Sequence, residues 1–126
     1  MSKKFTVKKK IENIHKTISV PGDKSLSIRW VLFSSLANGI SISKNLLISE
    51  DVKAAIDAVR KLGIKVNIRK NICKIYGRGV DGYKYKKNIV INAQNSGTLA
   101  RLILGLLINT KFPIKLIGDK SLSKRD

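Results

Sequence analysis

The sequence predicts an α/β fold of the α+β kind, in which helices cover a sheet of short strands. Three observations indicate it. Segments that alternate in hydrophobicity, as strands do, lie between apolar segments of helical spacing. Their order is strand, helix, strand, helix, strand, strand, and such an order needs a sheet covered by helices. At 126 residues, 43% of them hydrophobic, the chain is at most one ordinary domain with enough apolar surface for a core.

The first two elements flank a sharp break in the chain. Residues 17–20 (TISV) are mostly β-branched and predict a strand, which Pro21 and Gly22 end. Residues 25–38 follow as a helix that is apolar on most sides and is therefore expected to be buried. Asp23 or Ser25 can cap its N-terminus, and the pair at 38–39 (NG) is expected to end it.

The next four elements come from clear local patterns. Residues 40–43, 64–68 and 72–76 predict strands, and residues 70–71 (KN) a turn between the last two. Ser49 can cap a helix over residues 50–62, whose apolar residues recur at spacings of three and four. Glu50 and Asp51 are interpreted as acidic residues of its first turn, and Gly63 closes it.

After a loop at 77–88 the pattern restarts. Residues 88–93 predict a strand, 94–97 a turn, 98–109 an apolar helix and 112–117 a further strand. This succession echoes residues 17–38 and indicates an internal structural repeat. Residues 118–125 (GDKSLSKR) also match residues 22–29 (GDKSLSIR) at all positions but one, out of register with that repeat. We do not assume that both copies bind the same group. The second unit is incomplete, which indicates a truncated gene product.

The net charge of +18 suggests anionic partners. The 20 lysines and 6 arginines are scattered along the chain, and no zinc-ligand, RNP or heptad spacing is present. We therefore expect anionic small molecules and no nucleic-acid partner. No run approaches the ~18 apolar residues of a membrane span, so no membrane partner is expected. No signal peptide is evident, and the single Cys73 is interpreted as a buried thiol, which predicts a cytoplasmic protein.

The junction at residues 21–29 (PGDKSLSIR) is the first candidate site. Lys24 in a first helical turn faces the positive end of the helix dipole, which costs about 0.3–1 kcal/mol unless an anion lies there. Free N–H groups at a helix start favour phosphate or carboxylate. Ser25 and Arg29 are four residues apart and share one helix face. We interpret the junction as a socket for a phosphorylated or carboxylated small molecule. The alternative is a solvated helix cap.

The turn at residues 95–98 (NSGT) is the second candidate site. Gly97 can let the backbone come close to a ligand, and Asn95 and Thr98 can form hydrogen bonds with it. Arg101 follows near the start of the predicted helix. The alternative is a helix cap with glycine in a tight turn.

These segments, in this order, resemble the 5-enolpyruvylshikimate-3-phosphate synthase (3-phosphoshikimate 1-carboxyvinyltransferase) family. The motifs are residues 21–25 with Arg29, residues 95–98 with Arg101, and residues 118–125, so the resemblance covers nearly the whole chain. It implies part of an inside-out α/β barrel of two lobes, each built from three β-α-β-α-β-β units. One unit is complete here and a second is begun. Residues 1–20 would be an N-terminal strand segment that joins the other lobe, and residues 21–126 the first part of one lobe, truncated at the C-terminus.

The resemblance also implies the reaction. The family transfers the enolpyruvyl group of phosphoenolpyruvate to the 5-hydroxyl of shikimate 3-phosphate and releases phosphate, in the pathway to chorismate and the aromatic amino acids. It needs no metal or organic cofactor, and we expect a monomer at full length. By resemblance the residues have these roles: Lys24 is catalytic and contacts both substrates, Ser25 and Arg29 bind shikimate 3-phosphate, Gly97 and Arg125 bind phosphoenolpyruvate, and Asn95, Thr98 and Arg101 support that pocket.

Three features depart from the family pattern. Gln94 stands where the family usually has glycine, and Asp126 where it usually has proline. The carboxylates that manage proton transfer lie beyond this sequence, and no acid pair here replaces them. The sequence therefore predicts a transferase fragment without turnover on its own. The related enzyme that acts on UDP-N-acetylglucosamine lacks the Asp-Lys-Ser signature and fits less well. A stand-alone anion-binding module and a basic nucleic-acid-binding protein are the alternatives.

Overall fold

The computed structural model describes residues 6, 8 and 20–125. The predicted strand at 17–20 lies outside this range except for Val20, which is not in a strand. Most of the predicted segment 1–20 is likewise outside it. The elements, in order, are α1 (Lys24–Leu36), β1 (Asn38–Lys44), α2 (Glu50–Lys61), β2 (Lys65–Arg69), β3 (Ile72–Arg78), β4 (Val90–Asn92), α3 (Gly97–Leu106), β5 (Lys115–Ile117) and the 3-10 helix η1 (Leu122–Lys124). This order confirms the predicted mixed α/β fold.

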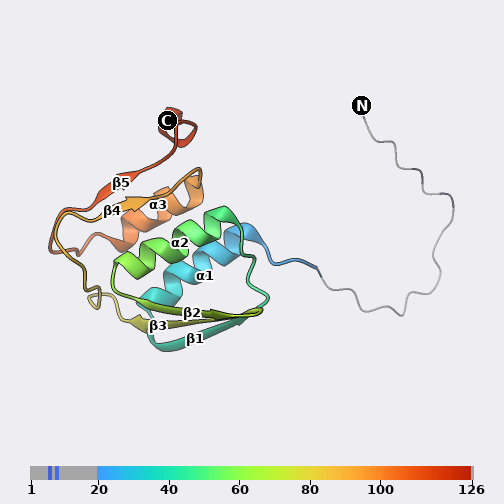
Figure 1. Cartoon of the computed structure of the whole chain (residues 1–126), viewed down its shortest axis with the longest axis horizontal. Helices are drawn as coiled ribbons and strands as arrows, with labels where there is room; N and C mark the ends of the chain where they lie inside the picture. The colour runs from blue at the N-terminus through green and yellow to red at the C-terminus, as the bar shows by residue number, and fades with distance from the viewer. Residues whose placement is uncertain (1–5, 7, 9–19, 126) are drawn as a thin grey trace.

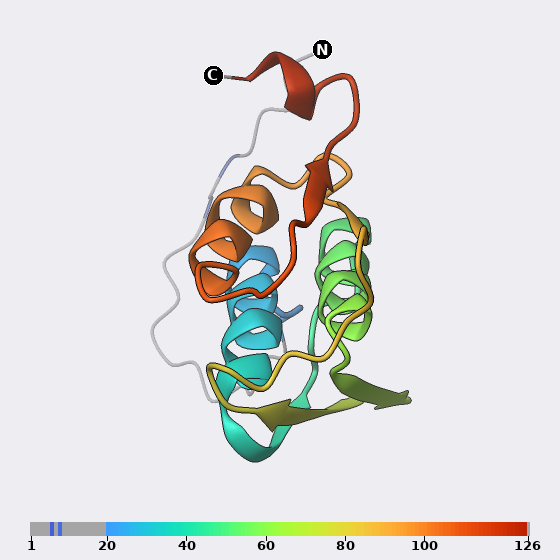
Figure 2. The same cartoon turned by 90° about the vertical axis from the view of Figure 1, so that its left-hand side faces the viewer.

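An antiparallel sheet of three strands, in the order β1-β3-β2, forms one layer. The helices all lie on one side of it (Figures 1 and 2). Alternate residues of the strands face those helices, and Val66, Cys73 and Ile75 are buried there. Burial of Cys73 as a free thiol agrees with the sequence interpretation.

Helix α2 packs across α1 and supplies much of the core. Ser49 caps α2, and its hydroxyl accepts a hydrogen bond from the Val52 amide at 3.4 Å. The buried side of α2 carries the apolar residues of the predicted spacing, and Gly63 follows its end with φ +86°. Because cap, periodicity and terminal glycine all agree, the predicted helix matches the observed one closely.

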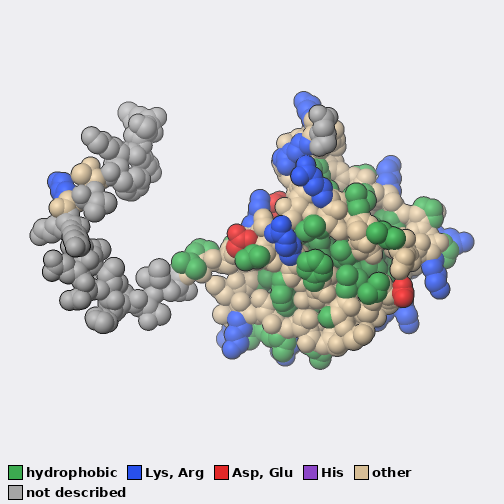
Figure 3. All heavy atoms as spheres, turned by 180° about the vertical axis from the view of Figure 1, so that it is seen from behind, with side chains coloured by type: hydrophobic (Ala, Val, Ile, Leu, Met, Phe, Trp, Pro, Cys, Tyr) green, Lys and Arg blue, Asp and Glu red, His purple; other side chains and the backbone are tan. Residues whose placement is uncertain are grey.

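Helix α1 differs from the expectation that it is buried on most sides. Ile28, Val31 and Leu32 are buried, but Leu26 and Phe33 are 65% and 58% exposed. Figure 3 shows hydrophobic side chains gathered over one face of the molecule. Phe33 also lines a groove of about 460 Å³ between α1 and α3.

The end of α1 is also earlier than predicted. Asn38 and Gly39 begin β1 and do not end the helix, because both residues pair with the far end of β3. Gly77 of β3 makes this close approach possible. A Cβ atom at Gly77 would lie 2.2 Å from the Ala37 carbonyl oxygen and 2.3 Å from that of Ser34. Only glycine lets β3 pass the end of α1 at this distance.

The second unit forms a parallel pair, β4 and β5, connected through α3. The succession of strand, turn, helix and strand is as predicted, but both later elements are shorter. Helix α3 ends at Leu106 and not at residue 109, and β5 begins at Lys115 and not at residue 112. Pro113 has no N–H to donate to a strand pairing, which explains the late start of β5. Within the described residues, no helix is long and apolar enough to span a membrane.

Candidate functional site

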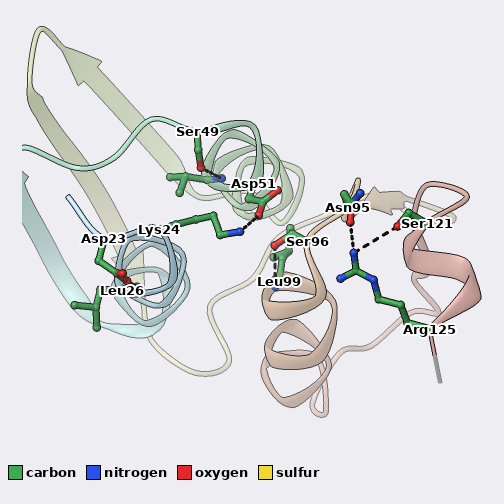
Figure 4. A network of polar contacts seen from close by, with 11 residues as sticks. Asp23, Lys24, Leu26, Ser49, Asp51, Asn95, Ser96, Leu99, Ser121 and Arg125 are labelled. Atoms are coloured by element: carbon green, nitrogen blue, oxygen red, sulfur yellow. Dashed lines mark hydrogen bonds and ion pairs between the residues drawn. The ribbon is translucent and has the colours of Figure 1, made fainter. Parts of the chain in front are cut away.

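The N-termini of α1, α2 and α3 converge beside the C-terminal segment (Figure 4). A side chain caps each of these helices. The Asp23 carboxylate accepts a hydrogen bond from the Leu26 amide at 2.7 Å, which settles the choice between Asp23 and Ser25. Ser96 accepts one from the Leu99 amide at 3.3 Å. Each helix N-terminus carries roughly half a positive charge, so their convergence makes a region that attracts anions.

Lys24 reaches across from the first turn of α1 to the first turn of α2. Its ammonium nitrogen lies 3.0 Å from the Asp51 carboxylate, whose side chain is 19% exposed. From the sequence we expected a ligand to supply the anion that Lys24 needs, whereas Asp51 supplies one in this structure. Asp51 is a helix-start residue as predicted, but it is also a site residue that the sequence interpretation missed. The signal that could have found it was the unfavourable position of Lys24 itself.

The N-terminus of α3 faces the other side of this region. The Ser96 hydroxyl accepts its hydrogen bond from the Leu99 amide. The amides of Gly97 and Thr98 therefore have no acceptor among the described residues. A Cβ atom added to Gly97 would contact the Arg125 guanidinium at 3.5 Å, so the open side of Gly97 faces that cation.

Arg125 comes from the C-terminal segment after η1. Its guanidinium donates to the Asn95 side-chain oxygen and, at 3.5 Å, to the Ser121 hydroxyl. These two bonds hold the cation next to the N-terminus of α3 (Figure 4). Asn95 therefore positions Arg125, a contact between residues 30 apart in the sequence.

An open, polar cleft of about 520 Å³ lies between these elements. Its lining consists of six of the predicted site residues and one acid: Lys24, Asn95, Gly97, Thr98, Arg101, Arg125 and Asp51. Ser25 and Arg29 lie one turn apart on α1 and are not part of this lining. The described residues include no group of three or more histidine, cysteine, aspartate or glutamate side chains placed to hold a metal ion.

Gln94 is the first residue of the turn before α3, and its φ is +54°. Its amide donates to the Asn92 side-chain oxygen at 2.8 Å, and its carbonyl accepts from the Asp119 amide at 2.8 Å. A left-handed backbone favours glycine. The turn keeps its shape with glutamine at this position, at a cost in backbone energy.

The two copies of the repeated segment, residues 22–29 and 118–125, begin in the same way. Asp119 accepts from the Leu122 amide at 2.7 Å, as Asp23 does from Leu26. The first copy continues into the helix α1, whereas the second stops after the 3-10 helix η1. The shared sequence therefore makes the same aspartate cap in two different parts of the fold.

The comparisons with known proteins agree with this arrangement. Residues 8–125 match the family model of EPSP synthase (3-phosphoshikimate 1-carboxyvinyltransferase). The chain belongs to the EPSP synthase family. The 3-phosphoshikimate 1-carboxyvinyltransferase of Bacillus cytotoxicus is 42% identical over 114 residues, which are 90% of this chain and 27% of that protein. The Streptococcus suis protein of the same name is 41% identical over 119 residues, 94% of this chain and 28% of its own length.

A solved structure gives the same result. The EPSP synthase from Acinetobacter baumannii superimposes with a TM-score of 0.79 at 38% identity, over 86% of this chain and 24% of that one. The chain thus spans about a quarter of the length of the proteins it matches.

Proposed function

We propose that the chain forms part of an enzyme that transfers the enolpyruvyl group of phosphoenolpyruvate to the 5-hydroxyl of shikimate 3-phosphate and releases phosphate. The observation that carries the proposal is the cleft in which Lys24, Arg101 and Arg125 meet the N-terminus of α3. Both substrates are polyanions, and fixed cations with helix N-termini are the groups that hold phosphate and carboxylate. The relatives with this activity in their names match 90% and 94% of this chain at 42% and 41% identity.

Phosphoenolpyruvate is assigned to the side of the cleft at α3. The unpaired amides of Gly97 and Thr98 can donate to its phosphate, and Arg125 can hold its second charged group. Asn95 orients Arg125 through the hydrogen bond between them. Arg101, one turn into α3, adds positive charge to the same wall.

Shikimate 3-phosphate is assigned to the side at α1. Ser25 and Arg29, which follow Lys24 on α1, would bind its phosphate, and Lys24 in the lining of the cleft would contact both substrates. When the cleft is empty, Asp51 neutralises Lys24. An arriving phosphate competes for the same ammonium group and releases it from this ion pair.

The described part of the cleft supplies binding and electrostatic stabilisation, which are large contributions to such a transfer. It does not supply acid–base chemistry. Asp51 is the one carboxylate among the described residues that line it, and Lys24 is paired with it. General acid–base catalysis of the transfer needs groups of its own. We therefore expect no turnover from this chain alone.

Complementation tests the proposal. The purified chain is mixed with the part of the Bacillus cytotoxicus relative that it does not match, and phosphate release from the two substrates is measured. We expect release from the mixture and none from either part. Lys24→Ala in the chain should lower the rate about a hundredfold, the usual effect of removing one preorganised group.

Lys61→Ala is the matched control. Lys61 is also ion-paired, with Asp57 at 3.3 Å, but it lies outside the cleft, and its loss should change the rate less than twofold. If no mixture is active, the proposal is tested by calorimetric titration of shikimate 3-phosphate into the chain and into its Lys24→Ala and Arg29→Ala variants. Steady release by the chain alone, or equal effects of the Lys24 and Lys61 variants, would contradict the proposal.

We also propose that the protein works in the cytoplasm, on the support of Cys73, which is buried as a free thiol.

A further inference from the structure

The three-stranded sheet has a second face, which points away from all the helices (Figures 1 and 2). The pairing registers determine which residues share it. From one end to the other, Asn38 lies opposite Arg78, Ile40 opposite Tyr76 and Lys65, Ile42 opposite Lys74 and Asn67, and Lys44 opposite Ile72 and Arg69. We call these residues the outer sheet face. Their alternates, Val66, Cys73 and Ile75, are buried beneath the helices.

The outer sheet face is strongly positive. It carries Lys44, Lys65, Arg69, Lys74 and Arg78, all exposed, and no acidic residue. None of these five side chains takes part in an ion pair within the described residues. Lysines that look scattered in the sequence are therefore gathered on one surface, because alternate strand residues point the same way.

The cations lie along a track. Successive outward residues of one strand are about 7 Å apart, twice the rise per residue. At each such step along β3, at least one of the three strands contributes a cation. These are Arg78 at the first step, Lys65 at the second, Lys74 at the third, and both Lys44 and Arg69 at the fourth. The track is thus roughly 20 Å long by the same spacing.

Apolar side chains lie between these cations. Ile40 and Ile42 are 61% and 56% exposed on the edge strand β1. Tyr76 lies at the centre of the face, and the Lys65 ammonium nitrogen is 5.0 Å from the centroid of its ring. The surface therefore presents an aromatic ring and a cation together, in alternation with aliphatic groups.

We propose that the outer sheet face binds single-stranded nucleic acid without sequence preference. The sugar–phosphate backbone lies along the cations, and the bases contact Tyr76 and the two isoleucines. Proteins that bind single strands combine a positive track with aromatic platforms in this way, often on a sheet. The proposal differs from the expectation of no nucleic-acid partner, which rested on lysines scattered along the sequence and on the lack of zinc-ligand, RNP or heptad spacing.

The alternation of charged and apolar groups favours a single strand over a lipid surface. A membrane-binding face gathers its apolar residues into one region that enters the bilayer and surrounds it with cations. Here each apolar residue has a cation across the neighbouring strand or one step along it. An extended chain of phosphates and bases matches that alternation, and a lipid surface does not.

Fluorescence anisotropy with a labelled twelve-residue oligothymidylate tests the proposal. The complete 126-residue chain is compared with the triple variant Lys44→Ser, Lys65→Ser, Lys74→Ser and with a control triple, Lys84→Ser, Lys86→Ser, Lys111→Ser, of equal net charge. We expect the outer-face triple to bind at least about tenfold more weakly, and the control less than about threefold. Because the outer-face triple lacks three cations that neutralise phosphates, the slope of log K against log salt should fall by about 2.

Further measurements distinguish binding at the outer sheet face from binding at the cleft. Saturating inorganic phosphate, which we expect to occupy the cleft, should leave the affinity for the oligonucleotide unchanged when the ionic strength is held constant, as should Lys24→Ala. Tyr76→Ala should weaken binding about fivefold or more through lost stacking. Amide chemical-shift changes on adding the oligonucleotide should centre on residues 72–78.

Three results would overturn the proposal: equal losses in the two triple variants, binding abolished by phosphate, or shift changes centred on the cleft. Binding of the chain to vesicles with one third phosphatidylserine, together with no binding to the oligonucleotide, would overturn it in favour of a membrane surface.

Discussion

Replacing Gln94 by glycine should stabilise the protein. Gln94 has φ +54°, a conformation that costs an L-residue about 1–2 kcal/mol. Glycine avoids this cost but loses about 0.5–1 kcal/mol of backbone entropy on folding. The difference predicts a gain of about 0.5–1 kcal/mol in the free energy of unfolding. Both hydrogen bonds of Gln94, to Asn92 and from Asp119, use its backbone and are retained.

Urea denaturation followed by far-ultraviolet circular dichroism measures this change. A gain of this size should also raise the melting temperature by about 2–6 °C for a chain of this length. Gln94→Ala is the control, because it removes the same polar side chain but keeps the Cβ atom that makes φ +54° unfavourable. If the alanine variant gains as much stability as the glycine variant, the side chain and not the backbone is responsible, and the argument fails.

Four further predictions concern the cap, the cleft, the sheet and the pH dependence. Asp23→Ala removes the cap of α1 and should lower the free energy of unfolding by about 1 kcal/mol in urea titrations, while Asp23→Asn restores most of it. Asp51→Asn frees Lys24 and should tighten the binding of inorganic phosphate several-fold in calorimetry. The free energy of unfolding should fall by less than about 1 kcal/mol, because the ion pair is partly exposed. Weaker phosphate binding would contradict the proposed competition between Asp51 and phosphate for Lys24. Gly77→Ala places a methyl group against the Ala37 carbonyl and should cost about 1–3 kcal/mol, whereas Gly105→Ala, where a Cβ meets nothing, should not destabilise. Burial raises the pKa of the Cys73 thiol and of the Tyr83 hydroxyl, so the folded chain holds protons that the unfolded chain releases. The free energy of unfolding should therefore be full below pH 9.0, the ordinary pKa of the thiol, and should fall as the pH rises further. If both groups contribute, the fall should be smaller in Tyr83→Phe.

The elements that the sequence predicted well are those with a local signal at each end. Helix α2 has Ser49 before it, Gly63 after it and a regular apolar spacing between. The end of α3 was misplaced because its apolar run continues past the last helical turn, and the end of α1 because the pair Asn38–Gly39 resembles a helix stop. The end of α1 is determined by a strand far along the chain, because Asn38 pairs with Arg78 of β3. No local pattern encodes that pairing.

The candidate site shows the same division. Lys24, Gly97 and Arg101 could be predicted because each lies at or near a helix N-terminus that follows a turn. The ion pair between Lys24 and Asp51 could not, since it joins the first turns of two helices that meet only in the fold. The outer sheet face was missed for a related reason, because the residues that compose it alternate with buried ones along three separate strands.

The convergence of three helix N-termini has a consequence for the speed of binding. The positive ends of α1, α2 and α3 are fixed in place before any ligand arrives, and Arg101 and Arg125 stand with them. A small dianion is therefore drawn toward the cleft during diffusion, and its association rate exceeds that of a neutral molecule of equal size. The Debye length shrinks from ~10 Å at 0.1 M salt to ~3 Å at 1 M. Encounter should thus slow steeply over this range of ionic strength, while dissociation, which is governed by short contacts inside the cleft, changes much less.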